Sequence, residues 1–164
     1  YLAFRYRKLG RRTPQSSWVV DGRVKGIGSV EEYVYAAAKA VADCDAVKFA
    51  ASGREDWDVR MLGNGRPAYA ELQNCRTWST KDVVGDFARE VAKASNGVVE
   101  AIQVEVADKA RADAVNASAE TKVKTYACVV WFSADRSDED ARRVSASAPL
   151  AVHHSAPIKF RGLL

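Results

Sequence analysis

An aspartate that follows an arginine and lies between glycine turns is the side chain in this sequence best suited to covalent or acid–base chemistry. Residues 52–67 read SGREDWDVRMLGNGRP, with acidic residues set among arginines. Glycine adopts backbone angles closed to other residues, and Asn64-Gly65 followed by Arg66-Pro67 is a strong turn signal. The sequence therefore predicts that Asp56 is displayed on a loop between two bends.

The charge of Asp56 depends on its neighbours, and Arg54 precedes it by two residues. A nearby guanidinium favours the ionised form of a carboxyl group. We therefore expect Asp56 to be a carboxylate, able to attack an electrophilic carbon or to remove a proton. The structural alternative is an ion pair between Arg54 and Asp56 that only pins a turn.

The same segment resembles the signature of pseudouridine synthases, whose Arg/Leu-x-Asp loop carries the catalytic aspartate common to all their families. Residues 54–59 (REDWDV) are similar to the Arg-Thr-Asp-x-Gly-Val form of that loop. The longer run to Pro67 resembles the archaeal and eukaryotic "Pus ten" tRNA pseudouridine synthases. Three further segments agree with that family in order along the chain: Arg5 to Leu9 with Pro14-Gln15 and Trp18, then Lys124-Thr125-Tyr126, then Pro149-Leu150 with Val152-His153.

The resemblance implies an isomerisation of uridine to pseudouridine in RNA that requires no cofactor and no metal. Carried over residue by residue, Asp56 is the catalytic residue, and Arg54 orients it or fills the gap left by the flipped base. Tyr126 would hold the flipped uridine against its ring. Lys124 shares a strand face with Tyr126, since alternate residues of a strand point the same way. The alternative for Tyr126 is an ordinary place in a strand core.

Basic residues cluster around Tyr6 near the start of the sequence, a pattern suited to phosphates and base stacking. The formal net charge of +4 and the pI near 9.0 permit a polyanionic partner without demanding one. The alternative is a solvated basic surface. We predict RNA contacts from five cations of this segment and two that follow Asp56, namely Arg5, Arg7, Lys8, Arg11, Arg12, Arg60 and Arg66.

The pattern of apolar residues predicts an α+β fold, with a mixed sheet and helices on one face. A capping box at Ser29–Glu32 begins a helix that ends near Asp43, and Thr80 is the expected cap of a second helix that Asn96-Gly97 ends. Strands are predicted over 46–51, 68–72, 98–106, 122–132 and 157–163, a short helix over 137–144, and a loop or weak helix over 108–120. The resemblance implies that this is part of a pseudouridine synthase core.

The 164 residues suffice for one ordinary domain. The resemblance implies that they are the front part of a catalytic domain, with an RNA-binding domain before it and the end of the catalytic domain after it. Cys44, Cys75 and Cys128 form no paired motif, and His153-His154 lack a matching acid or thiol cluster. Neither a disulfide framework nor a metal site is therefore expected.

We expect an intracellular protein in a reducing compartment, because the cysteines indicate no disulfide framework. We expect no membrane partner, because no apolar run is long enough to cross a bilayer. Two other functions remain open. One is a non-catalytic RNA-binding factor, ribosomal or in ribosome assembly, that retains the synthase fold. The other is one half of a split enzyme, in which a protein partner or a missing chain segment completes the cleft through an open strand edge. The expected RNA partner is a tRNA or an rRNA.

Overall fold

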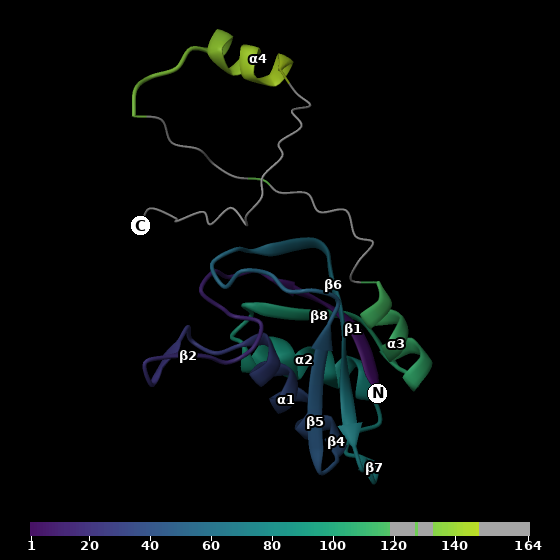
Figure 1. Cartoon of the computed structure of the whole chain (residues 1–164). Coiled ribbons are helices and arrows are strands. Elements are labelled where there is room, and N and C mark those ends of the chain that lie inside the picture. Colours follow the sequence, from purple (N-terminus) through teal and green to yellow (C-terminus); the bar gives the residue numbers. More distant parts are fainter. Residues whose placement is uncertain (119–126, 128–132, 148–164) are drawn as a thin grey trace. The chain divides into compact units, whose positions relative to one another are not determined.

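A four-stranded antiparallel sheet is the centre of the computed structural model, which describes residues 1–118, 127 and 133–147. The chain forms two compact units, Tyr1–Val123 and Lys124–Leu164, and the sheet belongs to the first. Its strands lie in the order β5-β6-β1-β8 (Figure 1). Their bounds are Leu2–Lys8 for β1, Ala46–Ala51 for β5, Met61–Gln73 for β6 and Val99–Val106 for β8. The α+β class is confirmed, with antiparallel pairing throughout the described strands.

Two helices pack on one face of this sheet, and their ends follow from local capping. Helix α1 (Val30–Val41) begins with the predicted capping box, in which Ser29 and Glu32 each accept a hydrogen bond from the other's backbone N–H. Helix α2 (Val83–Ala94) is capped by Asp82, not by Thr80. The Thr80 hydroxyl instead donates to the side chain of Asp86 within the helix.

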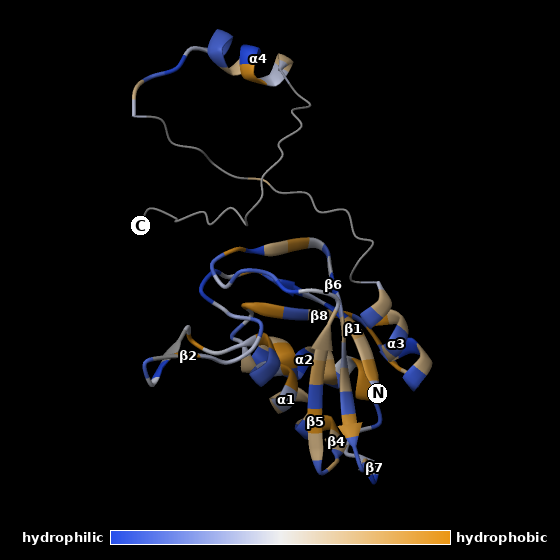
Figure 2. Ribbon diagram, viewed as in Figure 1, coloured by the Kyte–Doolittle hydropathy of each residue, from blue (hydrophilic) through white to orange (hydrophobic). Residues whose placement is uncertain are grey.

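The hydrophobic core fills the space between the sheet and these two helices. Leu2, Phe4 and Tyr6 alternate along β1 and all face the core, since alternate residues of a strand share a side. Phe87 of α2 is fully buried, and its ring centroid lies 5.1 Å from that of Phe4. Figure 2 shows the apolar faces of the helices turned toward the strands. This packing holds β1 rigidly beneath the candidate site.

Helix α3 (Lys109–Ala117) packs against the opposite face of the sheet. Its Asn116 amide donates to the hydroxyl of Tyr69, which alternates along β6 with the core residues Ala68 and Ala70. The prediction of a loop or weak helix here is resolved in favour of a helix, because Asp108 caps its N-terminus. Helices therefore lie on both faces of the sheet, and not on one face as predicted.

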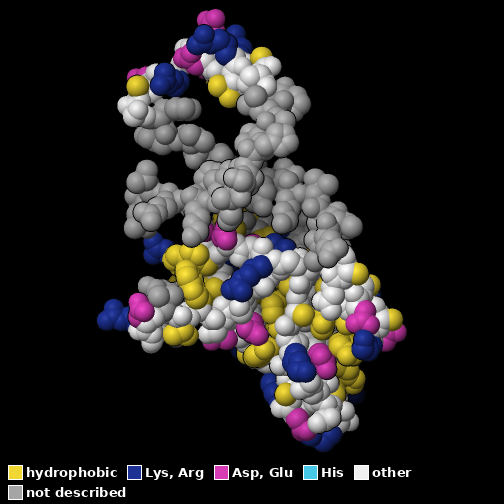
Figure 3. All heavy atoms as spheres, in the orientation of Figure 1, with side chains coloured by type: hydrophobic (Ala, Val, Ile, Leu, Met, Phe, Trp, Pro, Cys, Tyr) yellow, Lys and Arg dark blue, Asp and Glu magenta, His cyan; other side chains and the backbone are white. Residues whose placement is uncertain are grey.

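A short hairpin extends beside the sheet, made of β2 (Trp18–Val20) and β3 (Arg23–Lys25). Its two-residue turn, Asp21-Gly22, has positive φ at both positions, which suits the twist of a hairpin. Val19 is 56% exposed, and apolar side chains are visible at the surface in this region (Figure 3). Strands β4 (Ala42–Asp43) and β7 (Thr77–Trp78) form a separate small pair.

Helix α4 (Asp138–Ala146) belongs to the second unit. Ser137 caps it through a capping box with Asp140, so the predicted short helix is confirmed. The strands predicted over 122–132 and 157–163, together with Lys124, Tyr126 and Cys128, lie outside the described residues, Ala127 apart. Within the described part of the chain, Cys44 and Cys75 are free thiols, and no helix is long and apolar enough to span a bilayer.

Candidate active site

The loop that carries Asp56 leaves the sheet directly after β5, as the sequence predicted. Strand β5 ends at Ala51, and the N–H of Ser52 donates to the Pro67 carbonyl on the neighbouring strand β6 at 2.9 Å. The chain then runs through residues 52–60 and re-enters the sheet at Met61. The loop is therefore fixed at both ends by adjacent strands.

The predicted turn at Asn64-Gly65 is a bulge within β6. Tyr6 pairs with Arg66 but Lys8 pairs with Met61, so the four residues 62–65 of β6 lie opposite Arg7 alone, and three of them are extra. Arg5 binds this bulge, with Nε donating to the Asn64 carbonyl at 2.5 Å and Nη2 to the Gly65 carbonyl at 2.7 Å. The turn signal was correct about the positive φ values, and wrong about the chain reversal.

The bulge offers a matched pair of glycine substitutions, because both Gly63 and Gly65 have positive φ. A Cβ on Gly65 would lie 2.7 Å from the Tyr6 carbonyl oxygen, whereas a Cβ on Gly63 would meet open space. We expect Gly63→Ala to lower the free energy of unfolding by roughly 1–2 kcal/mol through backbone strain. Gly65→Ala should cost about 1–3 kcal/mol more through overpacking. Urea denaturation of both variants measures the difference, and equal losses would contradict the observed close approach.

Glu55 is the acidic residue of the loop whose side chain is buried, and sequence reasoning did not single it out. Its carboxylate is only 5% exposed and forms an ion pair with Arg66, whose Nε lies 3.0 Å from Oε2. The Tyr6 hydroxyl donates to the same oxygen at 2.9 Å. Burial, with the charge of Glu55, raises the pKa of Tyr6 well above its usual range, so this phenol remains a hydrogen-bond donor.

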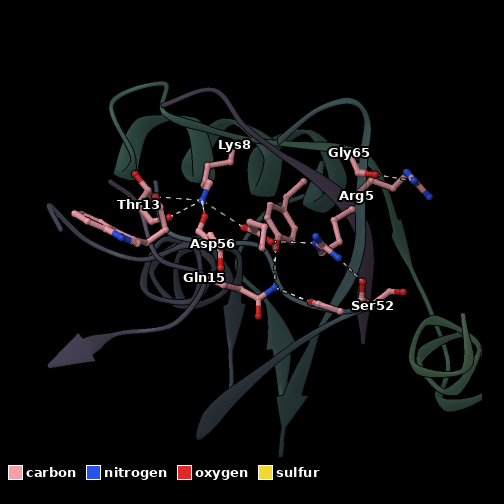
Figure 4. Close-up of polar contacts among 12 residues, drawn as sticks. Arg5, Lys8, Thr13, Gln15, Ser52, Asp56 and Gly65 are labelled. Carbon is pink, nitrogen blue, oxygen red and sulfur yellow. Dashed lines mark hydrogen bonds and ion pairs between the residues drawn. The ribbon is translucent and has the colours of Figure 1, made fainter. Parts of the chain in front are cut away.

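Lys8 departs from the sequence prediction, because it is fully buried and does not face solvent. Its ammonium donates to the carbonyls of Thr13 (2.9 Å), Asp56 (2.7 Å) and Trp57 (3.4 Å), as Figure 4 shows for Thr13 and Asp56. It also lies 3.8 Å from Oε1 of Glu55. Burial lowers the pKa of Lys8, while the charge of Glu55 opposes that change. Lys8 therefore anchors the loop from the protein interior and is not placed to bind RNA.

Asp56 and Arg54 both lie on the exposed side of the loop. Among the residues that the structure describes, the Asp56 carboxylate accepts no hydrogen bond and forms no ion pair, and the Arg54 guanidinium likewise has no acidic partner. The ion pair between Arg54 and Asp56, which was the structural alternative to a catalytic loop, is thus not formed within the described part of the chain. The backbone of Asp56 is anchored, whereas its side chain is left available.

The other predicted RNA-binding cations divide into two groups. Arg5 binds the bulge, Arg7 forms an ion pair with Glu100 at 2.6 Å, and Arg11 donates to the Asp58 carbonyl at 3.0 Å. Arg66 binds Glu55 and the Ser52 carbonyl. Arg12 and Arg60 are exposed, with no hydrogen bond or ion pair to the described residues. These two are the cations most available to an external phosphate.

Two tryptophans connect the loop to the β2–β3 hairpin. The Trp57 ring meets that of Trp18 edge-on, with centroids 5.5 Å apart. Gln15, just before the hairpin, donates to the Tyr6 hydroxyl at 2.8 Å and to the Gly53 carbonyl at 2.9 Å. The hairpin and the residue before it therefore contact the loop at Trp57 and at Gly53.

A groove of about 400 Å³ lies between helix α3 and the sheet face that it partly covers. Its wall touches the start of the loop, since the hydroxyls of Ser118 and Ser52 are 3.0 Å apart. Polar side chains predominate in its lining, which includes Arg5, Gln103, Glu105, Arg111 and Ser118. Across the described ranges, no three His, Cys, Asp or Glu side chains are grouped as metal ligands.

An α+β domain that presents an anchored loop with an available aspartate has the features that the resemblance to pseudouridine synthases predicted. The chain belongs to the family described as "Pus10, C-terminal", whose sequence model matches residues 1–161.

Proteins named tRNA pseudouridine synthase Pus10 are similar to nearly the whole chain. The human protein is 31% identical over 170 residues, covering 98% of this chain and 32% of its own length. The proteins of the archaea Thermofilum pendens and Methanopyrus kandleri are 32% and 33% identical, over 86% and 88% of this chain. The chain spans about a third of the length of each of these relatives.

Proposed function

We propose that this chain is part of a tRNA pseudouridine synthase and that Asp56 is its catalytic residue. The observation that carries the proposal is the combination of an anchored loop with an exposed carboxylate that has no partner among the described residues. Family membership and the names of the relatives support the same reaction and the same class of substrate.

The reaction needs a carboxylate near the ribose of the target uridine. Asp56 either attacks the sugar carbon as a nucleophile or removes a sugar proton as a base, and both routes use an ionised carboxylate. The bond from sugar to N1 of uracil breaks, the base turns, and the same sugar carbon bonds to C5, which loses a proton while N1 gains one. The target uridine would be flipped out of its RNA stack to reach the loop.

Arg54 is exposed beside Asp56, so it is placed to contact the RNA backbone or to fill the space that the flipped base leaves. Lys124 and Tyr126 are proposed to complete the uridine site on the strength of the family resemblance alone, since they lie outside the described residues. Within the described part, the groove beside α3 gives room for RNA groups next to the start of the loop.

Arg12 and Arg60 give a test of RNA contact that does not disturb the fold, because neither side chain binds the described protein. Replacing both with Gln should weaken tRNA binding. Each lost phosphate contact lowers the slope of log affinity against log salt by roughly 0.7–0.9, so the expected total change is about 1.4–1.8. Fluorescence anisotropy with labelled tRNA across a salt series measures this slope. Arg89→Gln with Lys93→Gln, on helix α2, is the matched control. An equal change in the control would show only an effect of net charge.

The function itself is tested by mapping pseudouridines in cellular tRNA after the gene is removed. Loss of a defined site, restored by the wild-type gene, is the expected result and would identify the substrate position. A complete set of pseudouridines after the gene is removed, together with tRNA binding by the purified protein, would favour the non-catalytic RNA-binding factor.

A further inference from the structure

Three acidic residues of the loop lie close enough to the buried Lys8 for their charges to act on it. Glu55, Asp56 and Asp58 lie within four consecutive positions, and the negative charge of each acts on Lys8 to raise its pKa, against the lowering by burial. Only Glu55 forms ion pairs with the buried cations, at 3.0 Å from Arg66 and 3.8 Å from Lys8. Of the three acids, Glu55 is therefore the one whose side chain lies in the interior beside Lys8 and Arg66.

Asp56 and Asp58 are the two acids that could replace Glu55 beside Lys8, since the charge of each already acts on that ammonium. Asp56 is the one next to Glu55 in sequence. The Lys8 ammonium donates to the backbone carbonyl of Asp56 at 2.7 Å. The Asp56 side chain therefore begins close to this cation. A buried cation without a counter-ion is strongly unfavourable, and removing its partner leaves a charge that attracts any acid within reach. Without Glu55, we expect the Asp56 carboxylate to turn toward Lys8.

We propose that Glu55 is a positioning residue that serves as the counter-ion of Lys8 and Arg66 and so keeps the Asp56 carboxylate away from these two cations. This inference rests on the proposed function. The hydrogen bond from Tyr6 fixes Glu55 further, and all three partners hold it toward the interior. Arg54 and Asp56, on either side of Glu55, are correspondingly exposed. The middle residue of Arg54-Glu55-Asp56 therefore determines which acid reaches the substrate.

Charge and shape can be separated by two substitutions in the complete protein. Glu55→Gln keeps the length of the side chain and an acceptor for Tyr6, and removes the charge. Glu55→Asp keeps the charge and shortens the side chain. We expect kcat to fall about 10–100-fold in Glu55→Gln with KM within about threefold of wild type, because the effect is on the reacting group and not on tRNA binding. In Glu55→Asp, kcat should stay within about fivefold of wild type.

Release of tritium from tRNA carrying 5-tritiated uridine measures kcat and KM. Glu90→Gln, an equivalent change on helix α2, where Glu90 pairs with Lys93, is the control and should leave both constants unchanged. A Glu55→Gln variant with kcat equal to or above that of Glu55→Asp would overturn the inference, since shape would then matter more than charge.

Two further outcomes keep the inference separate from folding and from the proposed function. If Glu55→Gln does not fold, Glu55→Asp is compared with Glu55→Asn, a pair matched in shape. If Glu55→Asp and Glu55→Asn have equal kcat, the inference is overturned. It is also overturned if every neutral variant fails to fold while Glu55→Asp is fully active, because Glu55 would then act on stability. Asp56→Asn is assayed alongside. If that variant is active, the proposed function fails; if it is inactive while Glu55→Gln retains wild-type kcat, only the present inference fails.

Discussion

Asp56→Asn should reduce pseudouridine formation by roughly 10²–10⁴-fold or more, the scale expected when a general acid–base group is removed. The asparagine keeps the size of the side chain and removes its charge. Because the Asp56 carboxylate accepts no hydrogen bond from the described residues, the free energy of unfolding should change by no more than about 0.5 kcal/mol. The affinity for tRNA should likewise be retained. Single-turnover assays with purified complete protein, together with anisotropy, measure the two effects separately.

Asp58→Asn is the matched control for this prediction, because it makes the same chemical change two residues further along the same loop. Asp58 contributes its backbone carbonyl to Arg11, and that contact does not depend on its side chain. We expect its rate to stay within severalfold of wild type. If both variants were equally slow, the loop would act through its total negative charge. If Asp56→Asn lost RNA affinity as much as activity, the residue would have a binding role.

Much of the fold could be predicted because its signals are local. The capping box of Ser29 and Glu32 and the apolar run at 46–51 each lie within a few residues, and helix α1 and strand β5 are found where they were expected. The start of α2 was wrong because Thr80 and Asp82 are both good capping residues, and the choice between them depends on the path of the chain. Local sequence thus identifies an element more reliably than its first residue.

The candidate site was predicted only in part, for a different reason. The display of Asp56 follows from the residues around it, whereas the burial of Lys8 depends on contacts with a loop 48 positions away. Lysine is almost never buried without a partner, so composition argues for an exposed cation. The sequence did contain one signal that Glu55 is the partner of Lys8. If Arg54 and Asp56 face outward, the residue between them faces inward. Predicting that Glu55 is buried also requires knowing that Lys8 and Arg66 are buried beside it, and no local sequence pattern shows this.

Lys8→Met should cause the largest loss of stability of any change considered, about 3–5 kcal/mol, the range for removing one partner of a buried ion pair. Methionine fills a similar volume, so the loss is electrostatic and not a matter of packing. Three backbone carbonyls, of Thr13, Asp56 and Trp57, would lose their donor, and Oε1 of Glu55 would lose the cation 3.8 Å away. Because one of those carbonyls belongs to Asp56, catalytic activity should fall together with stability.

Urea denaturation followed by tryptophan fluorescence measures the stability of this variant, since Trp57 lies in the loop. Lys48→Met is the matched control: Lys48 is exposed on strand β5, and its change should stay within about 0.5 kcal/mol. A loss below about 1 kcal/mol for Lys8→Met, with weaker tRNA binding, would mean that the ammonium reaches RNA as first predicted. A large loss of stability would instead show that the buried Lys8 holds the loop that carries Asp56 in place, so that this member of the basic segment supports the candidate site from the protein interior.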